Sequence, residues 1–384
     1  MSAAAVLLAS LSLTEAFEAA NRRDPNLLAA RAHLPVVEAG VTTAGAQLNP
    51  TLSASYGRDE PTFIAGVGMR FPVFGQRGAA VRTARAEVVV SEAVLAEQTV
   101  AEHAAVRRAY FTLAIAQAHV TLAEESTKLA RALADVARAR MEEGAAPPLD
   151  SSQADLAWHR AEQEQCAQEA ARDAARPALN YLLGDAAEAP STASDPLMPS
   201  IETRTLDHWV SLLEKHPAVI GAEAERLAAL ARAAQERTVN RPAPDVTIEL
   251  SNLPGGLGVR GTVAAEVPLL SRNEGPIRAA EATAVEATER EKATRAKLAA
   301  GLRAAWTRLT AAVSRARFFA ETQVPAAVQV EELARVSYRE GRAPLVAVLQ
   351  AQGDAMSSRL QAVDAVGDAQ NALADVEEAA GVGF

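Results

Sequence analysis

The sequence lacks the usual signatures of metal centres and active sites. Its single cysteine, Cys166, cannot form an internal disulfide, and no CxxC pair is present. The six histidines are scattered, with no pair four residues apart and no HExxH motif. We therefore expect no metal site and no cofactor. No catalytic constellation is apparent, so an enzyme is not expected.

The sequence is also poor in aromatic residues and in long apolar runs. Aromatic residues make up 4% of the chain, while 49% is hydrophobic and 22% is charged. This composition excludes disorder and is typical of long helices that pack through small side chains. Because no run of 18 apolar residues occurs, no membrane-spanning helix is expected. The net charge of −10, without a basic patch, makes nucleic acid a poor partner.

What is present instead is a long helical pattern. It runs from about 76 to 141, and roughly 65 residues at 1.5 Å each would form a rod about 100 Å long. The sequence Glu143-Gly144-Ala145-Ala146-Pro147-Pro148 interrupts it, and residues 149–183 read as a returning helix. These features predict a long α-helical hairpin. An earlier helix, over residues 13–48, is expected to break at Asp24-Pro25.

Two strands precede the long helix, at about 51–57 and 63–74. In the second strand, apolar residues alternate with small or polar ones. One face carries Phe63, Val67, Met69 and Phe71. Alternation of this kind suits either a half-buried hairpin or a membrane barrel strand with lipid on one side. The pattern alone leaves both alternatives open.

The same plan recurs in the second half of the chain. The first repeat covers 13–184 and the second 206–384, with a Pro/Ser/Thr/Asp-rich linker at 185–205. Strands are expected at about 245–252 and 257–268, followed by a helical run from 274 to 338. Pro268 matches Pro72 and Trp306 matches Tyr110 at an offset of 196, and Gly341 matches Gly144 at 197. A nearly constant offset indicates an internal two-fold repeat. Residues 1–12 read either as a remnant of a secretory signal or as a lead-in to the first helix.

With this repeated plan of helices and strands, the chain resembles the TolC-like outer-membrane efflux protein family. The resemblance extends over about 13–381 and rests on the order and duplication of several short motifs. These are Leu13-Thr14-Glu15-Ala16, Asp24-Pro25, Phe71-Pro72-Val73-Phe74, Ala109-Tyr110-Phe111, Met141-Glu142-Glu143-Gly144, Leu149-Asp150 and Leu179-Asn180-Tyr181-Leu182-Leu183-Gly184.

The resemblance implies a mainly α fold with a small β part. Each protomer of a homotrimer would give four strands to one shared β-barrel and its helical hairpins to a periplasmic α-barrel. The protein would lie in the outer membrane of a Gram-negative bacterium, in contact with its lipid and with its helices in the periplasm. It would be a passive conduit for drugs or metal ions, exported by an inner-membrane pump through a periplasmic adaptor protein.

The resemblance also assigns roles to the two helical tips. Adaptor contacts are expected at Gly144, Ala145, Pro147, Leu149, Gly341, Arg342 and Pro344. Asp150 would form the pore constriction alone, because Ala347 and Gln350 stand where the family has acidic residues in the second repeat. The first strand, of about seven residues, is short for a membrane-spanning strand. An elongated helical scaffold without transport activity therefore remains the alternative.

Overall fold

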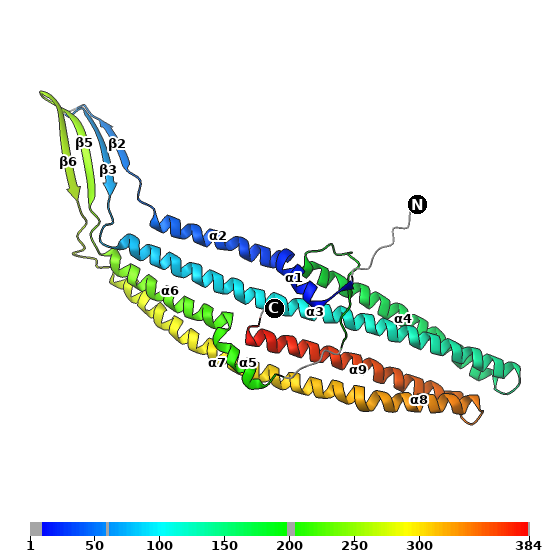
Figure 1. The fold of residues 1–384 in the computed structure, drawn as a ribbon. Coiled ribbons are helices and arrows are strands. Elements are labelled where there is room, and N and C mark those ends of the chain that lie inside the picture. Colours follow the sequence, from blue (N-terminus) through cyan, green and yellow to red (C-terminus); the bar gives the residue numbers. More distant parts are fainter. Residues whose placement is uncertain (1–9, 59–60, 198–203, 383–384) are drawn as a thin grey trace, which may run out of the picture. The chain divides into compact units, whose positions relative to one another are not determined.

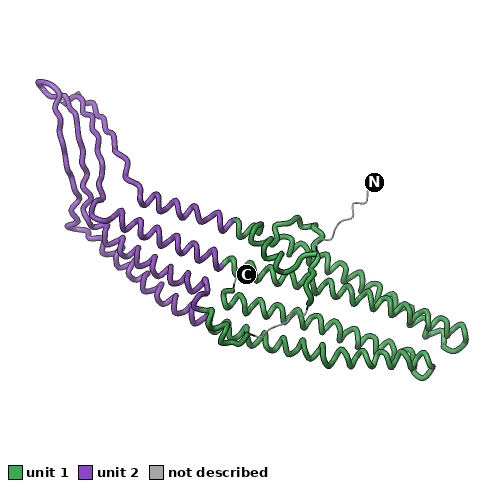
Figure 2. Tube along the Cα trace, viewed as in Figure 1, with its two compact units in different colours: residues 1–28, 98–213, 298–384 green, residues 29–97, 214–297 purple. Residues whose placement is uncertain are grey.

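The computed structural model describes residues 10–58, 61–197 and 204–382 of the chain. Residues 1–9 of the candidate signal remnant and 198–203 of the expected linker lie outside the described residues. The chain forms two compact units (Figure 2), of which unit 1 comprises Met1–Leu28, Gln98–Leu213 and Leu298–Phe384, and unit 2 comprises Ala29–Glu97 and Glu214–Lys297. Both expected repeats contribute to each unit.

Unit 1 is built from two helical hairpins (Figure 1), as the sequence predicted. In the first hairpin, α3 (Gln76–Glu142), which begins in unit 2, turns into α4 (Pro148–Leu183). In the second, α7 (Glu274–Phe318), which also begins in unit 2, leads through a π-helical turn (Phe319–Gln323) into α8 (Val324–Arg339) and then α9 (Leu345–Ala380). The unit also contains α1 (Leu13–Arg23), α5 (Leu206–Leu212) and a short parallel pair of strands, β1 (Ser10–Leu11) and β4 (Thr192–Ala193).

Proline and capping residues determine where the helices begin. α1 ends and α2 (Pro25–Gly45) begins around Asp24, whose carboxylate caps α2. His216 caps α6 (Pro217–Val239) in the same way, after the short 3₁₀ turn Leu213–Lys215. The helix break expected at Asp24-Pro25 is therefore present, and His216-Pro217 forms a second one. Pro35, by contrast, lies inside α2 without ending it.

Unit 2 contains a four-stranded antiparallel sheet in the order β2-β3-β5-β6. Its strands are β2 (Thr51–Tyr56), β3 (Phe63–Arg70), β5 (Asp245–Leu253) and β6 (Gly256–Ala264). The expected ends of the second and fourth strands, at 74 and 268, are wrong. β3 ends at Arg70 and β6 at Ala264, and both of these residues pair with Asp245, the first residue of β5. The residue before it, Pro244, has no amide hydrogen with which to extend either ladder. Phe71 therefore lies beyond β3, although its N–H still bonds the Pro244 carbonyl at 2.8 Å.

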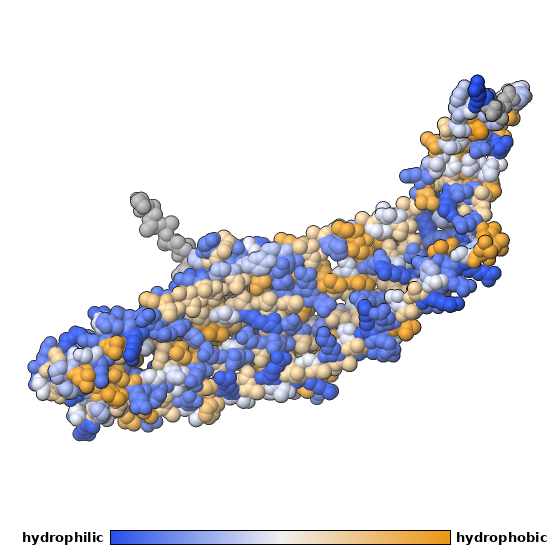
Figure 3. Space-filling view, turned by 180° about the vertical axis from the view of Figure 1, so that it is seen from behind, coloured by the Kyte–Doolittle hydropathy of each residue, from blue (hydrophilic) through white to orange (hydrophobic). Residues whose placement is uncertain are grey.

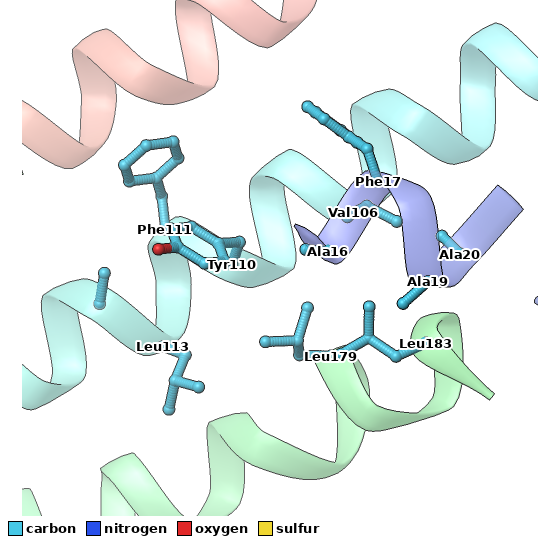
Figure 4. Close-up of a cluster of buried hydrophobic side chains, with 11 residues drawn as sticks. Ala16, Phe17, Ala19, Ala20, Val106, Tyr110, Phe111, Leu113, Leu179 and Leu183 are labelled. Atoms are coloured by element: carbon cyan, nitrogen blue, oxygen red, sulfur yellow. The ribbon is translucent and has the colours of Figure 1, made fainter. Parts of the chain in front are cut away.

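The cores are made largely of alanine, with a few large residues at fixed points. The core between α1, α3 and α4 surrounds Tyr110, Leu179 and Leu183 (Figure 4). The Tyr110 hydroxyl donates to the Leu11 carbonyl at 2.9 Å and accepts from the Asp195 N–H at 3.0 Å. Through these two hydrogen bonds, the buried Tyr110 connects α3 both to β1 and to the segment that follows α4.

The π-helical turn explains why the offset of the repeat changes. The offset is 196 at Trp306 and 197 at Gly341, so the second repeat has one additional residue between these positions. The turn Phe319–Gln323 lies in this interval. A π-turn holds one residue more than the α-helical turn it replaces. The additional residue is thus absorbed locally, and the helix on either side keeps its packing.

Candidate functional site: a two-faced sheet and two helical tips

Strand pairing brings the apolar sides of all four strands onto one face of the sheet. Leu52 pairs with Val67, Val67 with Ile248, and Ile248 with Gly261. A second row joins Ala54, Ala65, Leu250 and Val259. These side chains are not covered by the rest of the chain, since 48% of Val67 and 74% of Val259 are exposed. Phe63 and Met69 lie on the same face, while Phe71 follows after the strand has ended.

The opposite face is polar, and its charges are matched across strands. Glu249 pairs with Arg260, and Arg70 with Asp245. Opposite charges on directly paired residues stabilise a sheet, whereas like charges would repel. The small residues of β3 have a steric role on this face. A side chain added at Gly66 would place its Cβ 3.0 Å from Ser53 Oγ and 3.1 Å from Glu249 Cγ.

The sheet has two open edges. β2 pairs only with β3, and β6 only with β5, among the residues that the structure describes. Open edges carry unpaired backbone N–H and C=O groups that another strand can bind. Within the described part of the chain, no helix combines the length and the apolar character needed to cross a membrane.

The two helical tips have the same backbone geometry. At the first tip, Gly144 has a φ of +72°, and the N–H groups of Ala145 and Ala146 bond the Arg140 carbonyl at 2.7 and 3.1 Å. At the second, Gly341 has a φ of +73°, and those of Arg342 and Ala343 bond the Ser337 carbonyl at 2.8 and 3.2 Å. Corresponding positions differ by 197, as in the sequence comparison. A glycine is suited to each turn because a positive φ strains other residues.

The other expected tip residues lie around these turns. Pro147 and Pro344 directly precede α4 and α9, in extended conformation. Leu149 is 63% exposed, and Val346 of the second tip is also exposed, so apolar atoms lie among hydrophilic ones at this end of unit 1 (Figure 3). Arg342 forms an ion pair with Glu340 at 3.1 Å. The tips therefore present a mixed surface.

Arg140 connects the first tip to the second, a link that sequence analysis missed. Its guanidinium lies over the Tyr338 ring, 4.6 Å from the centroid, and donates to the Tyr338 carbonyl. Tyr338 is only 2% exposed. Burial and the nearby negative charge of Asp150 raise the pKa of its hydroxyl. The charge of Asp150, in the first turn of α4, thus influences the Tyr338 hydroxyl of the second tip. The sequence signal was weak, a lone tyrosine in an alanine-rich helix.

No group of three or more His, Cys, Asp or Glu side chains suited to a metal ion occurs within the described residues.

Comparisons with known proteins agree with this geometry. The family model "Outer membrane efflux protein" matches residues 16–185. Cobalt-zinc-cadmium resistance protein CzcC of Cupriavidus metallidurans is 27% identical over 380 residues, covering 97% of this chain and 90% of the relative. Protein CyaE of Bordetella pertussis is 31% identical over 260 residues, or 63% of this chain and 54% of CyaE.

Solved structures show the same fold. The outer-membrane channel OprN has a TM-score of 0.80 at 16% identity, covering 97% of this chain and 90% of OprN. The outer membrane protein VceC of Vibrio cholerae has a TM-score of 0.79 at 20% identity, covering 97% and 96%. The scaffold alternative is not favoured by these relationships. Residues 16–185 match the outer membrane efflux protein family and the chain is similar to outer-membrane channel proteins over nearly its whole length, so it is an outer-membrane channel component of an efflux system.

Proposed function

We propose that this chain is the outer-membrane conduit of a tripartite system that exports divalent metal cations. The choice of substrate rests on one observation. This chain is similar to the cobalt-zinc-cadmium resistance protein CzcC over 97% of its length. An inner-membrane pump would supply the driving force and a periplasmic adaptor would join the pump to this chain. Drugs are the second candidate substrate class.

Measuring the metal retained by cells tests whether divalent cations are the exported substrate. Deletion of the gene should increase cell-associated Co²⁺, Zn²⁺ and Cd²⁺ after exposure to these salts and lower the concentrations that inhibit growth. The plasmid-borne gene should restore both values. Sensitisation to hydrophobic drugs with unchanged metal content would instead assign the conduit to drug export.

We further propose that the functional form is a homotrimer with one shared barrel. The support is the four-stranded sheet, which has an exposed apolar face and an open edge at both β2 and β6. Lipid does not tolerate open edges, so strands of other copies must cover them. Native mass spectrometry of detergent-extracted protein should give three chains per particle. A monomer that retains its β signal would contradict this assembly.

The helical tips are the proposed adaptor contacts. Both tips have the same turn geometry, with Ala145 exposed at the first tip and Arg342 exposed at the second. Ala145→Trp and Arg342→Trp place bulk there without altering the two glycines. Both variants should reach the outer membrane normally but abolish metal efflux and adaptor cross-linking. Glu188→Trp, in the exposed connection after α4, is the matched control and should transport normally. Efflux by both tip variants would remove the docking role.

A further inference from the structure

Two connections lead from the sheet to the long helices, and both contain the same turn. The first connection, residues 71–75, joins β3 to α3, and the second connection, residues 265–273, joins β6 to α7. In each, the N–H of the residue after a proline donates to the carbonyl of the residue before it, at 2.9 Å. The prolines are Pro72 and Pro268. A three-residue turn of this kind suits the fixed φ of proline, so both repeats leave the sheet in the same way.

Each turn is followed by two exposed apolar residues. Val73 and Phe74 of the first connection are 63% and 51% exposed. Leu269 of the second connection is 75% exposed, and Leu270 is completely exposed. Figure 3 shows apolar atoms beside hydrophilic ones where the sheet meets the helices. These four side chains directly follow two strands whose apolar face is also uncovered, so the apolar surface of the sheet continues into the connections.

The end of α6 holds both connections in place. The Nη1 atom of Arg241 donates to the Phe74 carbonyl at 2.7 Å. The preceding residue, Asn240, donates through its side chain to the Arg272 carbonyl. Because adjacent residues bind the two backbones, the connections lie close together, and their apolar side chains form one patch. A gathered apolar patch with a polar rim is typical of an interaction surface.

The same region has a positive charge. Arg77, in the first turn of α3, and Arg272, in the second connection, are both exposed. Neither forms an ion pair within the described residues, whereas Arg278, farther along α7, pairs with Glu274 at 3.4 Å. The acidic residue of the connections is Glu266, so two positive charges face one negative charge. This local balance contrasts with the net charge of −10 of the chain.

We propose that the two connections bind the periplasmic leaflet of the outer membrane. Their apolar side chains enter the acyl-chain region, and Arg77 and Arg272 contact the phosphates of anionic phospholipids. Large apolar side chains next to basic ones are typical of segments that bind a membrane interface. Lipid is the expected partner because the patch continues the apolar face of the sheet in an outer-membrane protein. The inference rests on the proposed barrel and is independent of the exported substrate.

Spin labels on the full-length protein test where the second connection lies. Single labels are attached to Leu270→Cys, to Val259→Cys on the apolar face of β6, and to Val285→Cys on α7, each in a Cys166→Ser background. The protein is reconstituted in vesicles of phosphatidylethanolamine and phosphatidylglycerol. Relaxation of each label by oxygen, which concentrates in lipid, is compared with relaxation by a nickel chelate, which stays in water.

The labels at 259 and 270 should respond mainly to oxygen. Val285 is also exposed but lies about 16 Å along α7 from its first residue, so its label should respond mainly to nickel. If 270 responds to nickel while 259 responds to oxygen, the barrel stands and the inference is overturned. If both respond to nickel, the proposed barrel is wrong as well. Protection of 270 from both reagents also overturns the inference, because a second copy of the chain then covers the connection.

Lipid selectivity tests the two arginines. The wild type should bind spin-labelled phosphatidylglycerol in preference to phosphatidylcholine. The double variant Arg77→Gln, Arg272→Gln should lose up to about fivefold of this preference for each arginine, because a basic residue beside the membrane attracts anionic lipid. Arg303→Gln, at an exposed position farther along α7, is the matched control and should keep the preference. An unchanged preference in the double variant would contradict the contact with phosphates.

Discussion

At the residue scale, Glu377 of α9 is a buried acid whose protonation affects stability. Its Oε2 lies 3.0 Å from Arg107 Nε and its Oε1 lies 3.1 Å from Arg107 Nη2. Burial raises the pKa of Glu377 to about 7, although Arg107 and Arg204 act to lower it. An unfolded glutamate has a pKa of about 4.3. The folded protein thus binds this proton more tightly, and stability decreases as pH rises from the unfolded to the folded pKa.

Glu377→Gln should remove this pH dependence. Between about pH 5 and about pH 8, the unfolding temperature of the wild type should fall more steeply than that of the variant, because only the wild type must ionise a buried group. Thermal unfolding by circular dichroism at several pH values gives both slopes. Glu378→Gln, next in sequence but partly exposed, is the control and should retain the wild-type slope. Equal slopes for Glu377→Gln and wild type would contradict the prediction.

At the scale of the element, the two faces of the sheet should respond differently to charge. Leu52 and Ser53 are neighbours on β2 with opposite orientations, since Leu52 pairs with Val67 and Ser53 with Gly66. Leu52→Arg should prevent membrane insertion, because an arginine at the lipid midplane costs about 2–4 kcal/mol per chain. Ser53→Arg should insert. The yield of folded protein in outer-membrane fractions measures the difference, and similar yields would mean that the assigned faces are wrong.

The π-helical turn Phe319–Gln323 leads to a second prediction at the scale of the element. If it absorbs one additional residue, deletion of the exposed Ala320 should convert it to an α-helical turn and leave α7 and α8 packed as before. Deletion of Ala300, inside α7, should instead rotate all following residues by about 100° and disrupt the hairpin. Expression and thermal unfolding of the two deletions compare them directly. Comparable damage from both would show that the turn has another origin.

Sequence patterns predicted those elements whose signals are local. Alternation in β3 and β5 assigned their faces, and Gly144 and Gly341 marked both tips. The pattern did not show where β3 ends, because Phe71 continues the alternation beyond the last ladder residue. Contacts between distant segments were not predictable either. Arg140 and Tyr338 are 198 positions apart, and no local signal links them.

At the scale of the whole molecule, a trimer would place three copies of each tip residue around one axis, so the charges of the copies would add. Asp150 lies in the first turn of α4, and its charge reaches Tyr338 of the second tip. Three copies around one axis would form a ring of negative charge, and such rings favour cations in pores. The pore constriction at Asp150 remains a proposal, since it requires this arrangement. It agrees with the proposed export of divalent cations.

Single-channel recording tests this ring. Asp150→Asn should reduce the preference for cations over anions in planar bilayers, because it removes one negative charge per chain at the constriction without changing side-chain size. Asp155→Asn is the matched control, since Asp155 is one turn along the same helix and is neutralised by Arg138 at 2.9 Å. It should change selectivity less. If Asp150→Asn leaves the reversal potential in a salt gradient unchanged, then Asp150 does not line the conducting path, and its position reflects only the favourable interaction of a carboxylate with a helix N-terminus.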